Sequence, residues 1–354
     1  MRRVDFRSDT LTKPSEEMRH CMANAEVGDN FYGEDPTVRK LEDHVAELLG
    51  KEAALFVLSG TMGNLISVRS QVSPGKAMIL SETSHLHLNE TGHLASVCGL
   101  TSYPVQTIHG YFDLDMLNER WLVIPAGSHP SILSPSLGGI AVENTHNGDG
   151  GCCVSLDHIQ AISEFAKARS IPLHMDGARL FNASISLGAT PADLVQDVDS
   201  VSFCLSKGLA APGGALIAGR ADFIEEARHW RQMVGGGMRQ AGIFAASGLF
   251  ALRYNVDRLR EDHHVAQKLA KGISEMGLSV NLSAVDTNIV MCFIPPELGD
   301  PNDFYNDLRD VGVFVLPPKK NRLRFVTHAD VSENDIDMAL AQISSLVAKR
   351  QGKI

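Results

Sequence analysis

The chain has 354 residues, of which 44% are apolar, 32 are lysine or arginine and 42 are aspartate or glutamate, giving a net charge of −10. This length suggests one large domain with a smaller one, and an acidic chain without a basic block argues against nucleic acid as a partner. No apolar run approaches the roughly 20 residues of a membrane span. The N-terminus, "MRRVDFRSDTLTKP", lacks the apolar stretch of a signal peptide. We therefore expect a soluble globular protein without membrane association.

The six cysteines are scattered along the chain and form no CxxC pair. This usage is typical of reduced thiols. It therefore predicts a cytoplasmic protein.

The first long predicted helix is the segment "DPTVRKLEDHVAELLG", residues 35–50. Asp35 can cap its start, Pro36 suits its first turn and Gly50 can end it. Its apolar residues recur every three or four positions, which places them on one face of the helix.

Short apolar segments then alternate with amphipathic helical segments. The predicted strands are 53–58, 77–81, 139–143, 172–176, 200–205 and 214–219, and helical stretches such as 155–169 and 222–234 lie between or after them. This alternation predicts an α/β fold with a mostly parallel sheet that is covered by helices on both faces.

The character of the sequence changes after about residue 251. One charged helix is predicted over 253–273, followed by shorter strands at 287–294 and 322–328 and by a final helix. We expect a large domain over residues 1–254, which includes the N-terminal segment, and a small C-terminal α+β domain over residues 255–354.

Three predicted strands lead into residues that are unusual in a buried sheet. The strands "GIAVE" and "PLHMD" end at Glu143 and Asp176, and "SVSFCL" runs into Lys207. Arg179 follows Asp176 by three positions. Because the carboxyl ends of parallel strands meet at one edge of a sheet, we expect these side chains to share a rim.

Lys207 and Asp176 together suit pyridoxal phosphate. A lysine can hold the cofactor's aldehyde as a Schiff base, and a carboxylate can keep its ring nitrogen protonated. The turn "SGTMGN" offers small residues and backbone N–H groups for a phosphate. Each residue alone has a structural alternative, a snorkelling lysine or a weak ion pair. Their joint occurrence on successive strand–helix units favours function.

The sequence resembles the L-threonine aldolase family over nearly its whole length. The motifs that carry this resemblance are "VDFRSDTLTKPS", "VGDNFYGEDPTV", "KEAALFVLSGTMGN", "ENTHN", "HMDGARLFNAS", "CLSKGLAAPGG", "GGGMRQAG" and "LRFVTHAD". Members of this family are fold-type-I pyridoxal-phosphate enzymes with an aspartate-aminotransferase-like fold. The resemblance therefore implies pyridoxal 5'-phosphate as the cofactor and a small amino acid as the substrate.

The resemblance also implies how the cofactor is held. Lys207 matches the Schiff-base lysine and Asp176 matches the partner of the ring nitrogen. Gly60 and Thr61 match the phosphate-binding turn. Arg239 matches an arginine that reaches the phosphate from a neighbouring subunit. A homo-oligomer with shared active sites, either a dimer or a tetramer, is therefore expected.

Further residues match the substrate site of the family. Ser8, Arg179 and Arg324 match the groups that hold the substrate carboxylate, and a fork of guanidinium donors would fix its orientation. The resemblance also implies that Arg179 lies beside the cofactor. Tyr32 matches a tyrosine of the site region.

Two histidines are candidates for the base. His85 matches the histidine that stacks on the cofactor ring, and His129 matches a second family histidine on its N-terminal side only. A histidine is a plausible base near neutral pH. The implied reaction is reversible retro-aldol cleavage of L-threonine or L-allo-threonine to glycine and an aldehyde.

Three alternatives stay open at this point. Some fungal alanine racemases are closely similar to threonine aldolases, so racemisation of a small amino acid is the first. A catalytically silent scaffold is the second, and the presence of Lys207 disfavours it. A metal site is the third, built from His85, His87 and His93 or from "DHH" at 262–264, but neither set has a convincing zinc spacing. We expect no metal.

Overall fold

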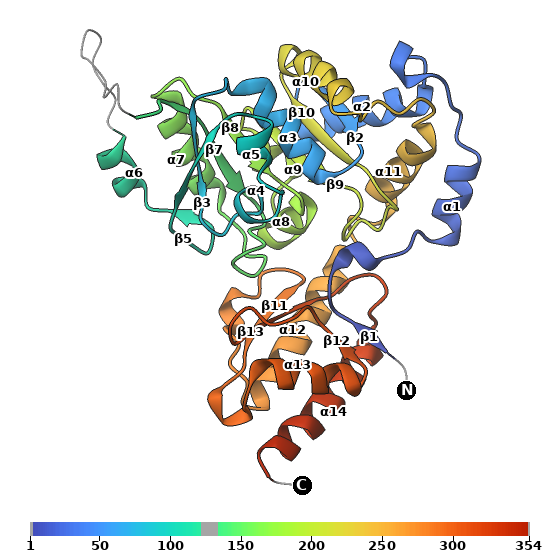
Figure 1. Cartoon of the computed structure of the whole chain (residues 1–354). Helices are drawn as coiled ribbons and strands as arrows, with labels where there is room; N and C mark the ends of the chain where they lie inside the picture. The colour runs from blue at the N-terminus through green and yellow to red at the C-terminus, as the bar shows by residue number, and fades with distance from the viewer. Residues whose placement is uncertain (1–2, 122–133, 353–354) are drawn as a thin grey trace.

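The computed structural model describes residues 3–121 and 134–352, and Figure 1 shows them as two parts joined end to end. The larger part is built on a seven-stranded sheet with the order β2-β10-β9-β8-β7-β3-β4. Its strands are β2 (Ala53–Val57), β3 (Ala77–Ser81), β4 (Thr101–Val105), β7 (Leu137–Glu143), β8 (Leu173–Asp176), β9 (Ser200–Cys204) and β10 (Ala215–Gly219). All six strands predicted for this part are confirmed, and β4 at the sheet edge is an addition.

Only β10 runs against its neighbours, so the prediction of a mostly parallel sheet is confirmed. Because β10 is antiparallel to both β2 and β9, β2 runs in the same direction as β9. The carboxyl ends of β2, β3, β7, β8 and β9 therefore lie at one edge.

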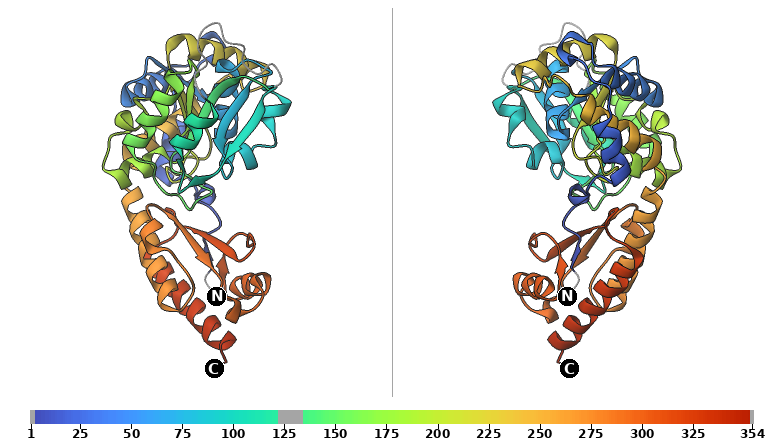
Figure 2. Two further views of the ribbon diagram at one scale, coloured as in Figure 1. Left: turned by 90° about the vertical axis from the view of Figure 1, so that its left-hand side faces the viewer. Right: turned by 90° about the vertical axis from the view of Figure 1, so that its right-hand side faces the viewer.

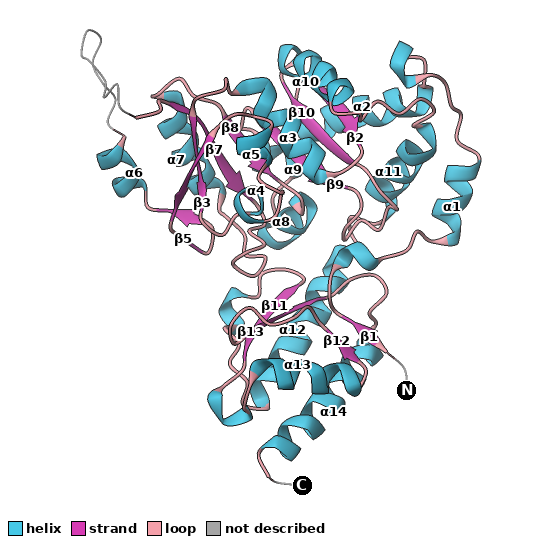
Figure 3. Cartoon of the chain, in the orientation of Figure 1, coloured by secondary structure: helices cyan, strands magenta, loops and turns pink. Residues whose placement is uncertain are grey.

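Helices cover both faces of this sheet, as Figure 3 shows by secondary structure. The helices of the larger part are α1 (Glu16–Ala23), α2 (Pro36–Leu49), α3 (Gly60–Gln71), α4 (His85–Leu88), α5 (His93–Ser96), α6 (Leu114–Arg120), α7 (Leu156–Lys167), α8 (Leu180–Leu187), α9 (Pro191–Val195), α10 (Ala221–Met233) and α11 (Gly242–Tyr254). A small hairpin, β5 (Thr107–Ile108) with β6 (Tyr111–Phe112), lies beside them.

The apolar strands divide their side chains between two cores. In β2, Phe56 packs in the core that holds α2, α7, α8 and α11, whereas Leu55 and Val57 pack with α3 and α10. In β10, Leu216 and Ile217 divide in the same way. Since successive side chains of a strand point to opposite faces, a sheet covered on both sides needs continuous apolar strands. This requirement explains why these segments read as unbroken apolar runs.

The smaller part has its own core. It contains β11 (Ile289–Phe293), β12 (Val313–Phe314), β13 (Arg322–Val326), α12 (Leu259–Glu275), α13 (Pro301–Asp310) and α14 (Glu333–Arg350). The strands predicted over 287–294 and 322–328 and the final helix are confirmed. In Figure 2, α12 runs from the larger part into the smaller one. None of the helices in the described residues combines the length and the apolar character needed to cross a membrane.

The structure corrects two predictions, one on the helix at the domain boundary and one on the domain to which the N-terminal segment belongs. The helix predicted over 253–273 is interrupted, because α11 ends at Tyr254 and α12 begins at Leu259. The N-terminal segment starts in the small domain, where β1 (Val4–Asp5) pairs in parallel with β12 and Phe6 is fully buried in the smaller core. The apolar side chains of this segment find their partners in the C-terminal part, which sequence distance does not reveal.

Asp35 caps α2 as predicted and also fastens two loops to it. One carboxylate oxygen accepts from Thr37 N and Val38 N, and the other accepts from Gly28 N and Gly242 N. We expect Asp35→Ala to lower the free energy of unfolding by about 3 kcal/mol, because it removes a cap and leaves buried N–H groups unpaired. Urea unfolding at fixed protein concentration measures this, and Asp35→Asn, which keeps one acceptor oxygen, should lose about half as much.

Candidate active site

The residues predicted to share a rim do lie at one edge of the sheet. Glu143 and Asp176 are paired across β7 and β8, and Asp176 is paired with Ser202 of β9. Lys207 follows the end of β9 by three residues, and its carbonyl accepts from Thr12 Oγ1 at 3.3 Å. His85 begins α4 beyond the end of β3, and its backbone N–H donates to Glu143 Oε2 at 2.8 Å.

Asp176 is a buried carboxylate without an adjacent ion pair among residues 3–121 and 134–352. Its oxygens accept from Asn64 Nδ2 at 2.9 Å and from the N–H of Ala178 at 3.0 Å. Burial, together with the carboxylates of Glu143 and Glu90, raises the pKa of Asp176. A cationic group placed against it would offset this cost, as a protonated ring nitrogen would.

Lys207 is half-buried, and no carboxylate in the described part of the chain forms an ion pair with it. Its charge lies close enough to affect the pKa values of Asp9 and Asp176. The amine is therefore free to engage a ligand group at the strand ends.

Gly60 and Thr61 form the first turn of α3, where backbone N–H groups have no acceptor within the helix. Ser59 caps the helix by accepting from Met62 N at 3.2 Å. A Cβ atom at Gly60 would lie 2.6 Å from the sulfur of Cys204, so only glycine fits there. The N-terminus of a helix with close backbone approach is suited to a phosphate.

Ser8, Arg179 and Arg324, which are expected to hold the substrate carboxylate, are brought together. The two guanidinium groups differ in how many of their donors are already paired within the chain. Both oxygens of Asp9 accept from Arg179, each at 2.8 Å, and Arg179 Nη1 donates to Asn147 Oδ1 at 3.2 Å. Burial opposes ionisation of Asp9, but Arg179 outweighs it and lowers the pKa of Asp9 to about 2. Most of the Arg179 fork is therefore already occupied, which the sequence did not reveal.

Arg324 is the guanidinium that stays open toward a ligand. Its Nη1 donates to Asn147 Oδ1 at 2.7 Å and its Nη2 to the carbonyl of Arg7 at 3.4 Å, beside Ser8. No carboxylate in the described residues forms an ion pair with it. Burial and then the charge of Arg179 lower its pKa to about 10, so it remains cationic at neutral pH.

Glu90 is a site residue that the sequence reasoning missed. It is 1% exposed, and its carboxylate contacts His85 Nδ1, His93 Nε2 and Asn64 Nδ2. The only feature of the sequence that could have indicated a buried polar partner was Asn64, a polar residue on a helix that packs against the sheet. Its connection to Glu90, 26 positions away, depends on tertiary contacts.

Tyr32 and Arg239 lie together on the surface, apart from the strand ends. Arg239 Nη1 contacts both oxygens of Asp29 at 3.2 Å, and its guanidinium lies 4.5 Å from the ring centre of Phe31. Phe31 and Tyr32 are 53% and 70% exposed. Neither Tyr32 nor Arg239 contacts Lys207 or Asp176 within the chain. His129 lies outside the described residues.

The two histidine motifs considered as metal ligands are not arranged as that interpretation requires. Residues 85–88 form a helix rather than the strand that would align His85 with His87. Within the described residues, one group of possible ligand atoms lies within 4.8 Å of one another, that of His85, Glu90 and Asp176. There the His85 ring is already hydrogen-bonded to Glu90, at 2.7 Å.

The second proposed metal cluster is also used structurally. Asp262 pairs with Arg258 at 2.8 Å. His263 Nε2 contacts Asn182 Nδ2, and burial lowers the pKa of His263 to about 4. These groups support the start of α12.

A cavity of about 380 Å³ opens from the rim toward the smaller part. Its lining includes His85, Asn89, Asn147, Met291 and Arg324. It therefore joins the open guanidinium to the histidine at the strand ends.

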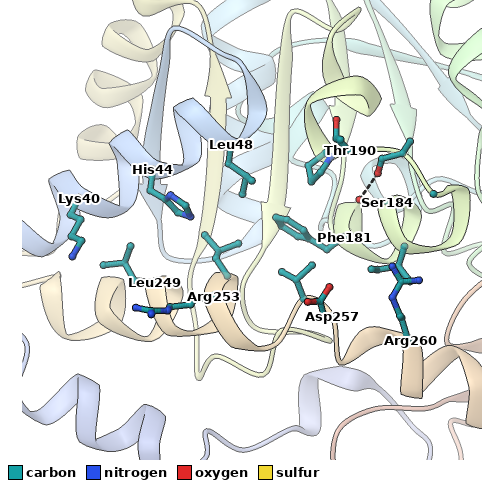
Figure 4. A pocket seen from close by; sticks show the side chains of 16 residues that line it. Lys40, His44, Leu48, Phe181, Ser184, Thr190, Leu249, Arg253, Asp257 and Arg260 are labelled. Carbon is teal, nitrogen blue, oxygen red and sulfur yellow. Dashed lines mark hydrogen bonds between the residues drawn. The ribbon is translucent and has the colours of Figure 1, made fainter.

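Another cavity, of about 750 Å³, lies away from these residues between α2, α8, α11 and the start of α12. Figure 4 shows Phe181 and Leu48 in it, with Lys40, Arg253 and Arg260 around its edge. Lys207 and Asp176 line neither of these two cavities, but His85 and Arg324 line the smaller one, so we place the substrate site there.

The sheet order, the lysine and aspartate at its carboxyl edge and the smaller C-terminal part define the fold of fold-type-I pyridoxal-phosphate enzymes. Residues 5–295 match the family model described as Beta-eliminating lyase. A probable low-specificity L-threonine aldolase 2 of Arabidopsis thaliana is 44% identical over 346 residues, 96% of each chain. The chain belongs to the threonine aldolase family of lyases.

Two further comparisons agree. The low-specificity L-threonine aldolase of Escherichia coli K12 is 38% identical and covers 98% of this chain and 100% of its own. A solved threonine aldolase structure from Leishmania major has a TM-score of 0.81 with 21% identity, over 97% of this chain and 99% of that one. The latter supports the fold, and the former supports the family.

Proposed function

We propose that the protein is a pyridoxal-phosphate-dependent, low-specificity L-threonine aldolase that cleaves L-threonine and L-allo-threonine to glycine and acetaldehyde. The observation that carries this proposal is the meeting of Lys207, Asp176 and the N-terminus of α3 at one sheet edge, beside the open guanidinium of Arg324. The two curated relatives described above are named low-specificity L-threonine aldolases, and this favours Cα–Cβ cleavage over racemisation.

The residues present fit the cofactor. Lys207 would hold its aldehyde carbon, Asp176 would face its ring nitrogen, and the N–H groups of Gly60 and Thr61 would receive its phosphate. The missing Cβ at Gly60 and the buried, raised-pKa carboxyl of Asp176 both suit such a group. When bound, pyridoxal phosphate supplies an electron sink for the pair left on Cα when a bond to Cα breaks.

The chain itself supplies orientation and proton transfer. Arg324 and Ser8 would hold the substrate carboxylate, and Arg179 would support them through its pairing with Asp9. Removal of the β-hydroxyl proton drives loss of the aldehyde, and His85 faces the substrate cavity as a base. A hydrogen bond to Glu90 raises the pKa of His85 despite burial, which strengthens it as a base.

The cavity beyond Arg324 supports a broad range of side chains. Its volume of about 380 Å³ exceeds the space of a methyl group, and its lining mixes apolar Leu88, Met291 and Leu316 with polar Asn89. We therefore propose that larger β-hydroxy-α-amino acids are also cleaved.

Proton NMR of the loaded enzyme in D2O tests the reaction directly. L-threonine and L-alanine are followed in separate samples. Glycine and acetaldehyde from threonine, with alanine unchanged in chirality, support the aldolase. Rapid exchange of the alanine α-proton with formation of D-alanine, and little acetaldehyde, would contradict it and indicate a racemase.

Substitution of the open guanidinium gives a second test. We expect Arg324→Gln to raise KM for L-threonine about 10- to 100-fold, because a charge-assisted hydrogen bond to the substrate carboxylate is lost. Steady-state kinetics measures this, with the exposed Arg309→Gln as a control that should leave KM unchanged. An unaltered KM in Arg324→Gln would contradict the assignment of Arg324.

We also propose a homo-oligomer in which Arg239 and Tyr32 complete the site of a partner subunit. The support is their exposure, with Phe31, on a surface apart from Lys207. Mixing inactive Lys207→Ala and Arg239→Ala subunits should restore activity, because a hybrid dimer contains one site with both residues intact. Light scattering gives the oligomeric state, and absence of restored activity despite hybrid formation would contradict the sharing of active sites between subunits.

The buried free cysteines suit a cytoplasmic location, which remains a proposal.

A further inference from the structure

Glu90 lies between α4 and α5 and is among the most buried carboxylates of the chain. Oε1 accepts from His85 Nδ1 at 2.7 Å and from Asn64 Nδ2 at 2.7 Å, and Oε2 contacts His93 Nε2 at 2.5 Å. Burial opposes its ionisation, but these three donors outweigh it and lower the pKa of Glu90 to about 2. Glu90 is therefore an acceptor-only carboxylate at neutral pH.

An ionised Glu90 fixes the tautomer of His85. Because the carboxylate can only accept, the proton must be on His85 Nδ1, and the lone pair of the neutral ring is then on Nε2. No group in the described residues hydrogen-bonds His85 Nε2. The His85 side chain is 31% exposed and lines the substrate cavity with Asn147 and Arg324. Nε2 is thus the nitrogen available to take a proton from a ligand.

The donor directions behind Glu90 are also fixed. Gln71 Nε2 donates to Ser200 Oγ, which lies 2.8 Å from His174 Nδ1. Burial lowers the pKa of His174 to about 4, so its ring is neutral. Its single proton is on Nε2, because Nε2 faces Asn64 Oδ1, which can only accept, and His174 Nδ1 therefore accepts from the Ser200 hydroxyl. That proton goes to Asn64 Oδ1 at 3.1 Å.

Asn64 is the branch point of this chain of hydrogen bonds. Its amide group must point toward the Glu90 carboxylate, which can only accept, so its oxygen accepts from His174 and from the Ser202 hydroxyl. Its Nδ2 donates to Glu90 Oε1 at 2.7 Å and to Asp176 Oδ2 at 2.9 Å. One amide therefore connects the carboxylate behind His85 with the carboxylate assigned to the cofactor ring nitrogen.

We propose that Glu90 is a positioning residue that holds His85 as the Nδ1-protonated tautomer with Nε2 as the base, and that Asn64 ties this pair to Asp176. The inference rests on the proposed function, since it assigns His85 as the base. It is the arrangement by which a carboxylate orients a catalytic histidine.

The charged groups that face His85 come from several elements. Glu90 and Asp176 favour its protonated form, and Lys207 disfavours it. Glu143 accepts from its backbone N–H, and the cavity wall opposite contributes Lys319, Arg322 and Arg324. Glu90 is the only one of these groups that is hydrogen-bonded to the His85 ring in the described residues, so removing its charge should dominate the change.

The test compares Glu90→Gln and Glu90→Asp holoenzymes with the exposed Glu82→Gln control. Nitrogen-detected NMR of the histidine rings gives the tautomer and pKa of His85 without reference to turnover. In Glu90→Gln we expect the His85 pKa to fall, the Nδ1-protonated fraction to decrease, and kcat for threonine cleavage to drop about 10- to 100-fold with KM nearly unchanged. The acidic limb of the pH–rate profile should move to lower pH.

Glu90→Asp retains the charge and should keep the tautomer with an intermediate kcat, and Glu82→Gln should match the wild type. A His85 tautomer and pKa that are unchanged in a folded, cofactor-loaded Glu90→Gln enzyme would overturn the proposal.

If Glu90→Gln does not fold, Asn64→Ser provides the second variant. We expect the His85 pKa to change and cofactor binding to weaken in Asn64→Ser. If both the His85 pKa and cofactor binding are unchanged, the link to Asp176 is overturned. Absence of threonine cleavage by the wild type would refute the proposed function, whereas the NMR result would still judge the role of Glu90.

Discussion

Replacing Lys207 with alanine is expected to abolish threonine cleavage, with kcat reduced by about 10⁴-fold or more. Lys207 lies at the strand edge, close enough to Asp176 to affect its pKa, and the described residues offer its amine no carboxylate partner. Lys319 also lines the substrate cavity, but it belongs to the smaller part rather than to the strand ends beside Asp176. Coupled detection of acetaldehyde measures turnover, and the exposed Lys271→Ala should retain full activity.

Covalent attachment supplies an independent measurement on the same variant. Borohydride reduction of the loaded wild-type enzyme should leave the cofactor on the peptide that contains Lys207, as mass spectrometry would show. Lys207→Ala should give no such peptide, while apoenzyme folding stays intact by circular dichroism. A cofactor adduct on another lysine with wild-type turnover would refute the central assignment.

Asp176→Asn is expected to lower kcat by about 10³-fold and to weaken cofactor binding. A buried carboxylate beside a protonated ring nitrogen stabilises that charge, and a neutral amide of the same size cannot. Absorbance titration with pyridoxal phosphate measures affinity, and the exposed Asp157→Asn is the matched control. Wild-type kcat in a fully loaded Asp176→Asn enzyme would contradict this role.

Although Asp176→Asn should weaken cofactor binding, it should not lower the stability of the apoenzyme. The folded-state pKa of Asp176 is raised, so its ionisation opposes folding as the pH rises above the usual aspartate range. At neutral pH, apo Asp176→Asn should therefore be as stable as the wild type or more stable. Thermal unfolding with and without pyridoxal phosphate should show that the cofactor stabilises the wild type more than the variant. A large loss of apoenzyme stability would show that Asp176 serves the fold rather than the cofactor.

Much of the architecture followed from local patterns. Apolar runs such as 200–205 predicted the buried strands because both faces of this sheet are covered. The cap at Asp35 and the stop at Gly50 predicted α2 almost to the residue. The break between α11 and α12 was missed, because residues 255–258 include no glycine or proline to mark the turn.

Some residues of the site could likewise be predicted from the sequence, and others could not. Lys207 and Asp176 could be placed from their positions at strand ends, since parallel topology brings those ends together. The occupation of Arg179 by Asp9 could not, because 170 positions separate the pair and nothing local identifies the partner. Glu90 was missed for the same reason, since its donors come from α3, α4 and α5.

The sequence by itself therefore determined the strands, the parallel sheet and the edge that carries the lysine and the aspartate, because these depend on the periodicity of neighbouring residues. Only the tertiary structure decided that Arg324 rather than Arg179 presents an open guanidinium, that β1 belongs to the small domain, and that Glu90 and Asn64 connect His85 to Asp176. Hydrogen bonds and ion pairs between distant segments depend on directions and distances that residue order does not contain, and folding sets them only when the separate elements pack together.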